Sequence, residues 1–298
     1  MQKHTIKKII YLGVVMLCIG YRCSVEEGGP TGPSGSQPVT EGIEAKVADK
    51  SWKAFNYSAY LCGKQITLTG LDSANGTITI TLNDTVVGRT YELNTTSAHW
   101  ATYTPSNTGD LYTTYSHPQA GGMVVLSQFN KDSLIVSGSF IFYAYNLRTK
   151  TTITISEGDF SNISITKESY PTSGMRAYIG GKLWTSATAI GTISDSTITI
   201  RGENANGEQI YFHICNVLQD IYALNSQSCH WARYIAGSSD TIPYFSNTSS
   251  AVNGKVVISS ISADSVVQGS FVVSMYRASD KKTVQITQGL FNGIKLHR

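Results

Sequence analysis

The sequence predicts an all-β protein made of two tandem antiparallel β-sandwich or barrel-like domains related by internal duplication. Three observations support this fold class. Thr, Ser, Ile, Val and Tyr are abundant, whereas charged residues make up only 14% of the 298 residues, as is typical of short strands and tight turns. Apolar and polar residues alternate over many segments. Finally, an ordered series of residue matches recurs at a separation of 131 or 132 residues.

Residues 1–22 are expected to form a lipoprotein signal peptide. Lys3, Lys7 and Lys8 form a positively charged start, and the apolar run Ile9–Gly20 follows. This run is shorter than the roughly 20 residues that a membrane-spanning helix needs, and it suits the apolar core of a signal peptide. Cleavage before Cys23 removes four basic residues and leaves 19 basic against 20 acidic ones. The net charge of −1 provides no electrostatic footprint for nucleic acid.

The segment Ile19-Gly20-Tyr21-Arg22-Cys23 resembles the lipobox of bacterial lipoproteins, although Arg22 stands where a small residue is usual. Cys18 is the alternative acylation site, but it lies within the apolar core. The acidic pair Glu26-Glu27 resembles the export signal of surface lipoproteins in Bacteroidota-type bacteria. The resemblance implies lipid attachment at Cys23 and a location at the outer membrane or cell surface. Ordinary secretion with cleavage nearby is the other interpretation.

Residues 23–42 are expected to form a flexible tether, because five Gly and three Pro occur there without apolar periodicity. The rest of the chain is predicted to form repeat one, residues 43–166, and repeat two, residues 175–298. The matched segments include His99-Trp100-Ala101 with His230-Trp231-Ala232, and Gly138-Ser139-Phe140 with Gly269-Ser270-Phe271. A period this long indicates a duplicated domain rather than a solenoid repeat.

Within the repeats the apolar period is two. Thr77–Leu82 alternates cleanly, and Ser139–Tyr145 places Phe140 and Phe142 on one side of the predicted strand. Asn75-Gly76 and Asn206-Gly207 lie between strand-like segments, which favours hairpin turns there. Eight to ten short strands are expected in each repeat, joined as an antiparallel sandwich or barrel.

The repeats resemble Bacteroidota lipoprotein domains of unknown function. Those domains open on an Ala-x-x-x-Gly-Lys-x-Trp strand and close on Gly-Ser/Thr-Phe and Gly-x-Phe strands. Repeat two matches the opening at Ala177, Gly181-Lys182 and Trp184, whereas repeat one has Asp49-Lys50 in place of the Gly-Lys pair. The resemblance implies a β domain at the cell surface and supplies no activity.

Three cysteines remain after the signal segment. By the 131-residue separation, Cys215 and Cys229 correspond to Asp84 and Ala98, so both cysteines occur in one copy and neither in the other. This co-occurrence predicts a Cys215–Cys229 disulfide in an oxidising compartment. Cys62 is then the free thiol.

The sequence favours a non-catalytic protein that binds a glycan or protein ligand or serves in a surface assembly. Acidic residues are scattered, and the common nucleophile, phosphate-loop and zinc-protease motifs are absent from the sequence. We therefore assign no catalytic residue, metal or cofactor. The alternative is an envelope glycan-processing enzyme, because a carboxylate pair that forms only in space is invisible in a sequence.

The duplicated His-Trp-Ala-x-Tyr segment supplies the candidate ligand-binding residues, because each aromatic side chain recurs at the same place in its repeat. Exposed Trp and Tyr side chains suit glycan and protein surfaces. Packing in the sheet is the competing interpretation. The candidates are His99, Trp100, Tyr103, His230, Trp231, Arg233 and Tyr234.

Overall fold

The computed structural model describes residues 41–74, 76–105, 110–167, 172–217 and 221–298. The described residues belong to one compact unit, Val39–Arg298. The signal peptide, Cys23, nearly all of the tether and Asn75 lie outside the described residues. In the part of the chain that the structure describes, no helix has the length and hydrophobicity that a membrane crossing requires.

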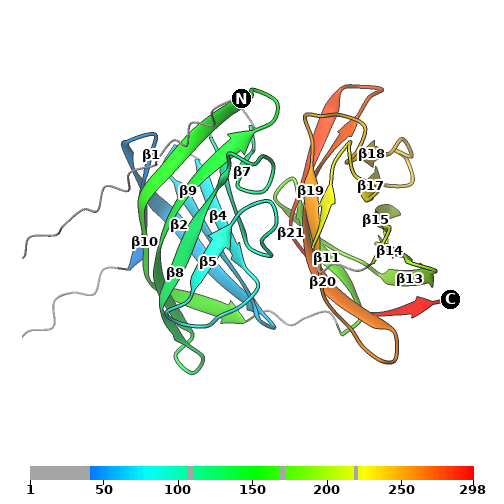
Figure 1. Ribbon diagram of the computed structural model, residues 1–298, viewed down its shortest axis with the longest axis horizontal. Helices are drawn as coiled ribbons and strands as arrows, with labels where there is room; N and C mark the ends of the chain where they lie inside the picture. The colour runs from blue at the N-terminus through cyan, green and yellow to red at the C-terminus, as the bar shows by residue number, and fades with distance from the viewer. Residues whose placement is uncertain (1–40, 75, 106–109, 168–171, 218–220) are drawn as a thin grey trace, which may run out of the picture. The chain divides into compact units, whose positions relative to one another are not determined.

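Repeat one is a 10-stranded sheet, coloured blue to green in Figure 1. The strands are β1 (Gly42–Val47), β2 (Lys50–Cys62), β3 (Gln65–Asp72), β4 (Thr77–Leu82), β5 (Thr90–Leu93), β6 (Trp100–Thr104), β7 (Tyr112–Thr113), β8 (Gly121–Asn130), β9 (Ile135–Asn146) and β10 (Thr151–Lys167). They pair in a closed circuit, β2–β3–β4–β6–β7–β9–β10 and back to β2, so the domain is barrel-like.

Repeat two is an 11-stranded sheet with the same circuit, closed by the β20–β21 pairing. It has one strand more because two strands, β12 and β13, stand where repeat one has the single strand β2. The strands are β11 (Gly174–Ile179), β12 (Lys182–Thr185), β13 (Thr188–Ser194), β14 (Thr197–Glu203), β15 (Glu208–Ile214), β16 (Ile221–Leu224), β17 (Trp231–Ala236), β18 (Tyr244–Phe245), β19 (Gly254–Ile261), β20 (Val266–Arg277) and β21 (Lys282–His297).

The period-two pattern decides which side chains fill each domain. Along β9, Phe140, Phe142 and Ala144 point inward and are buried, while the residues between them face outward. The duplicated all-β fold predicted from the sequence is therefore confirmed. The strands are not all short, since β10 has 17 residues and β21 has 16.

The Gly-Ser-Phe and Gly-x-Phe motifs form an interlocking pair of contacts in each domain. Gly158 lies opposite Phe140 across the β9–β10 ladder, and Phe160 lies opposite Gly138. A Cβ atom on either glycine would overlap the phenylalanine ring facing it. Each ring thus occupies the space that the missing side chain leaves free, which explains the Gly–Phe spacing physically. Repeat two builds the same pair from Gly269, Phe271, Gly289 and Phe291.

Candidate functional site

The duplicated histidines have the same structural role in both repeats. Nδ1 of His99 accepts a hydrogen bond from the backbone N–H of Asn83 at 3.0 Å, and Nδ1 of His230 accepts one from Cys215 at 3.2 Å. Each ring also packs edge-on against a buried tyrosine. Burial lowers the pKa of His99 to about 4 and lowers the pKa of His230. Both imidazoles are therefore neutral acceptors that fix the strand end.

Cys215 and Cys229 form a disulfide, and Cys62 is a buried free thiol. The backbone bond to the duplicated histidine shows that Asn83, rather than Asp84, is the true counterpart of Cys215. In repeat one the Asn83 amide donates a hydrogen bond to the carbonyl of Ala98, the counterpart of Cys229. The same two positions are therefore joined in both repeats, by a hydrogen bond in one and a covalent bond in the other.

One group of potential metal ligands occurs among the described residues. Sγ of Cys215, Sγ of Cys229 and a ring nitrogen of His230 lie within 4.8 Å of one another. The two sulfur atoms are bonded to each other, and Nδ1 of His230 already accepts the Cys215 N–H. Thiolates are the form of cysteine that binds metals, so this arrangement is a disulfide with a neighbouring imidazole and not a ready metal centre.

The two matched tryptophans differ in their surroundings. Trp100 is only 2% exposed and packs with Tyr115 of repeat one against Val257 and Val272 of repeat two. Trp231 is partly exposed. Trp100 is therefore an interface residue within the chain, and the hypothesis that it contacts an external ligand is wrong.

Tyr103 and Tyr234 are core residues rather than candidate ligand contacts, because strand alternation points both side chains toward the domain cores. They are 8% and 4% exposed, respectively, and each belongs to the core cluster of its repeat. The Tyr234 hydroxyl donates to Oε1 of Glu208 at 3.1 Å. Burial and this carboxylate raise the Tyr234 pKa.

The outward surface around Trp231 combines four rings and one guanidinium, and we call it the Trp231 face. It consists of Tyr211, His213, Trp231, Arg233 and Phe245, all partly exposed. The indole ring lies 5.2 Å from the centroids of Tyr211 and His213 and 6.1 Å from that of Phe245. The Arg233 guanidinium lies over the Tyr211 ring at 5.2 Å and forms no ion pair among the described residues. Of these five, only Trp231 and Arg233 were predicted from the sequence.

The missed members come from neighbouring strands. Cross-strand pairing joins Trp231 to His213, Arg233 to Tyr211 and Arg233 to Phe245. The signal available in the sequence is the alternation of β15, which puts Tyr211 and His213 on one side. Their adjacency to Trp231 depends on strand register, which the period alone does not specify.

The equivalent surface of repeat one has small side chains. The same pairing register aligns Thr79, Thr81, Thr102 and Thr113 with Tyr211, His213, Arg233 and Phe245. Thr81, Thr102 and Thr113 are buried, as is Trp100. Around its tryptophan, the duplicated surface therefore carries threonines where it is buried in repeat one, and large aromatic and cationic residues where it is partly exposed in repeat two.

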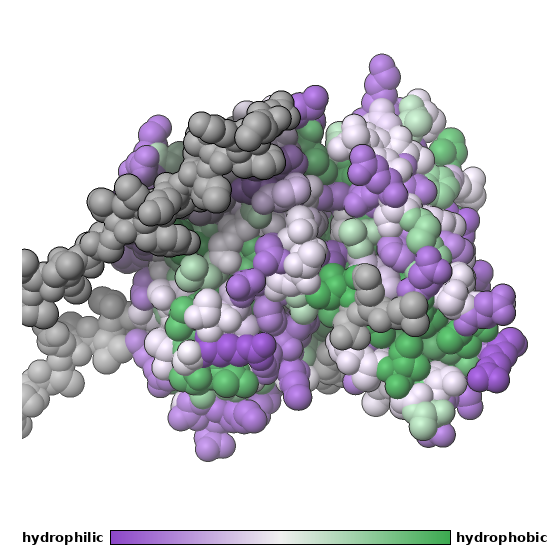
Figure 2. Space-filling view, in the orientation of Figure 1, coloured by the Kyte–Doolittle hydropathy of each residue, from purple (hydrophilic) through white to green (hydrophobic). Residues whose placement is uncertain are grey.

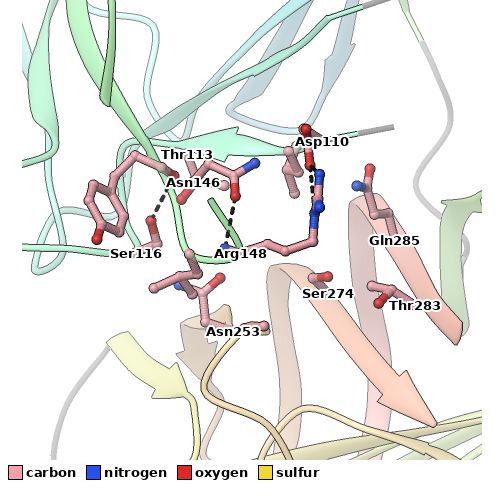
Figure 3. A pocket seen from close by; sticks show the side chains of 13 residues that line it. Asp110, Thr113, Ser116, Asn146, Arg148, Asn253, Ser274, Thr283 and Gln285 are labelled. Atoms are coloured by element: carbon pink, nitrogen blue, oxygen red, sulfur yellow. Dashed lines mark hydrogen bonds and ion pairs between the residues drawn. The ribbon is translucent and has the colours of Figure 1, made fainter. Parts of the chain in front are cut away.

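A cavity of about 160 Å³ is lined by residues of both repeats. Figure 3 shows its polar side chains. Asp110 and Arg148 face each other across an ion pair, and Nε of Arg148 donates to the Asp110 carboxylate at 2.8 Å. Asn253, Ser274, Thr283 and Gln285 lie on the repeat-two side. Because the one carboxylate of the lining is held by a guanidinium, the cavity lacks the pair of acids that glycoside hydrolysis uses.

Most of the chain matches one known protein family. A family described as a domain of unknown function (DUF6252) matches residues 40–164 and residues 172–295. A search of curated proteins and a search of solved structures each found no match. The chain therefore belongs to the DUF6252 family and carries two tandem copies of its domain.

Proposed function

We propose that this chain is a non-catalytic, lipid-anchored protein of the outer membrane or cell surface that binds a glycan or protein ligand through the Trp231 face. Lipid attachment at Cys23 would hold the duplicated domains at the membrane, with residues 24–42 as the tether. The observation that carries the binding role is the contrast between the two copies of one surface. Its tryptophan is buried in repeat one and partly exposed in repeat two.

The composition of the Trp231 face supports this proposal. Trp, Tyr, Phe and Arg are enriched at binding surfaces. The aromatic side chains offer a large contact area with few rotatable bonds, and the Arg guanidinium adds hydrogen-bond donors. Arg201, Glu203 and Gln209 lie on the adjoining strands and give this aromatic centre a polar edge. Figure 2 shows hydrophobic and hydrophilic residues intermixed on the visible surface of both repeats, so exposed apolar groups are not confined to one domain.

The test is a glycan array together with affinity capture from envelope extracts, using wild-type protein and Trp231→Ala. Leu183→Ala is the matched control, because Leu183 is a 58% exposed apolar residue that lies outside the Trp231 face. We expect a ligand that wild-type protein and the Leu183 variant retain and the Trp231 variant loses. Retention of every captured ligand by folded Trp231→Ala protein would overturn the proposal. A parallel hydrolysis screen tests the glycan-processing alternative.

A further inference from the structure

Inside the chain, repeat two contacts repeat one through the outward side of β19 and β20. Val257 and Val272 pack on Trp100. Nζ of the buried Lys255 donates to the backbone carbonyls of Asn94 at 2.9 Å and Ser97 at 2.7 Å. Ser270 adds a hydrogen bond to Asn83 at 3.2 Å. This contact joins two different surfaces of the duplicated domain.

Repeat one carries the same β19–β20 surface, and there it is open. Met123 pairs with Ile141, and Val125 pairs with Ser139, in the register that joins Lys255 to Val272 and Val257 to Ser270. We call the outward residues Met123, Val125, Ser139, Ile141 and Tyr143 the β8–β9 face. Met123 is 47% exposed and Tyr143 is 46% exposed, whereas their counterparts Lys255 and Ser274 are 1% and 7% exposed.

The chain thus exposes one copy of each of two surfaces that contact each other within it. The Trp231 face is the open copy of the surface around Trp100, and the β8–β9 face is the open copy of the surface around Val272. From this pairing we propose that the Trp231 face of one molecule docks on the β8–β9 face of a second copy of the same chain. The inference rests on the proposed function, because it names the partner of the Trp231 face.

The residue differences fit an interface between chains. Met123 stands where repeat two has Lys255, whose ammonium group donates to the backbone carbonyls of repeat one. Tyr143 stands where repeat two has Ser274. Met, Tyr, Trp and Arg are enriched in interface cores, whereas Lys and Ser are depleted. Tyr143 is larger than the serine it replaces, and the rings of the Trp231 face are larger than the threonines of repeat one, so the two faces would meet at a wider separation than the repeats do within the chain. Because the two surfaces differ, the contact is head-to-tail, and its repetition builds either a closed ring or an open chain of copies.

The experiment uses two differently tagged full-length chains, expressed together and treated with a short bis-maleimide cross-linker in intact membranes. One chain carries Met123→Cys and the other carries Phe245→Cys. We expect a cross-linked product that contains both tags, and none when either variant is expressed alone. Phe55→Cys replaces Met123→Cys as the control, because Phe55 is 80% exposed in the same repeat but lies on β2, outside the β8–β9 face.

Adding Trp231→Ala to the Phe245→Cys chain should weaken the association about 30-fold, the effect of truncating a central interface residue. The mixed product should fall accordingly. Absence of a mixed product from folded chains would overturn self-association. If Trp231→Ala still abolished binding of a glycan or of another protein in the ligand screen, the proposed function would stand without self-association. Products between identical variants alone would also overturn the head-to-tail pairing.

Discussion

At the residue scale, the neutral state of the duplicated histidines couples folding to pH. Burial lowers the pKa of His99 from 6.5 to about 4, and its Nδ1 accepts the Asn83 N–H only when it is unprotonated. The unfolded chain takes up a proton at higher pH than the folded chain does. The stability contributed by neutral His99 is therefore fully present above about pH 6.5 and is lost as the pH falls toward 4.

His99→Gln tests this coupling, because a glutamine amide oxygen can accept the same hydrogen bond but does not titrate. We expect the wild-type free energy of unfolding to decrease between pH 7.5 and pH 4.5 by more than that of the variant. Urea unfolding of both proteins at the two pH values measures the difference. An identical decrease in both would show that His99 does not carry the effect.

The disulfide is a second feature decided by single residues. Replacing Cys215 and Cys229 together by serine reopens a loop with a sequence separation of 14, which should cost about 3 kcal/mol of stability. Chemical denaturation measures this loss. Mass spectrometry after alkylation without reductant should find Cys215 unmodified in the wild-type protein. Alkylation of Cys215 under those conditions would rule out the bond.

Residue identity predicted part of the candidate site and missed the rest for a physical reason. The repeated His-Trp-Ala-x-Tyr segment led to Trp231 and Arg233, but alternation within β17 sends Tyr234 into the core. Tyr211 and His213 reach the same surface from β15, through cross-strand pairing. Which strands pair, and in which register, is set by the whole sheet.

At the scale of strands, the interlocked Gly–Phe contacts explain why the Gly-Ser-Phe and Gly-x-Phe motifs occur in both repeats. Gly158→Ala would place a methyl group against the Phe140 ring, and a shift of buried aromatic side chains should cost about 1–3 kcal/mol. Thermal or urea unfolding measures this, with Ser139→Ala as the control because Ser139 is an exposed neighbour of the buried Phe140 on β9. Equal stability of the two variants would contradict the interlock.

The positions of several strands could be predicted from the sequence, but the way the strands pair into a sheet could not. The alternating run Thr77–Leu82 is β4 residue for residue, because one buried face leaves a direct period-two record. The circuit that closes β10 onto both β9 and β2 depends on bends and bulges in long strands. The alternation of apolar and polar residues within one strand does not indicate which distant strands pair with it.

At the scale of the whole molecule, the duplication was readable because it repeats motifs, whereas the contact between repeats was not. Outward residues such as Val257 and Val272 look like ordinary solvent-facing strand residues in the sequence. Their burial depends on the neighbouring domain. A pair of repeats with equal folds can therefore present unequal surfaces.

The anchor belongs to this scale as well. We expect Cys23→Ala to abolish membrane association of the whole chain, since two or more acyl chains hold a protein firmly and none leaves only its weak surface contacts. Fractionation and intact-mass measurement of the mature protein test this. Wild-type protein recovered in soluble form, with a free N-terminus beyond Cys23, would contradict lipid attachment there.

The most direct test of the account compares the stability of Trp100→Ala with that of Trp231→Ala, because the two residues occupy the same position in duplicated domains. Trp100 is buried between the repeats, so its removal should cost about 3–5 kcal/mol. Trp231 is partly exposed, so its removal should cost only about 1 kcal/mol. Urea unfolding of both variants beside the wild type measures the difference. A loss for Trp231→Ala as large as that for Trp100→Ala would make Trp231 a packing residue and contradict its role in binding.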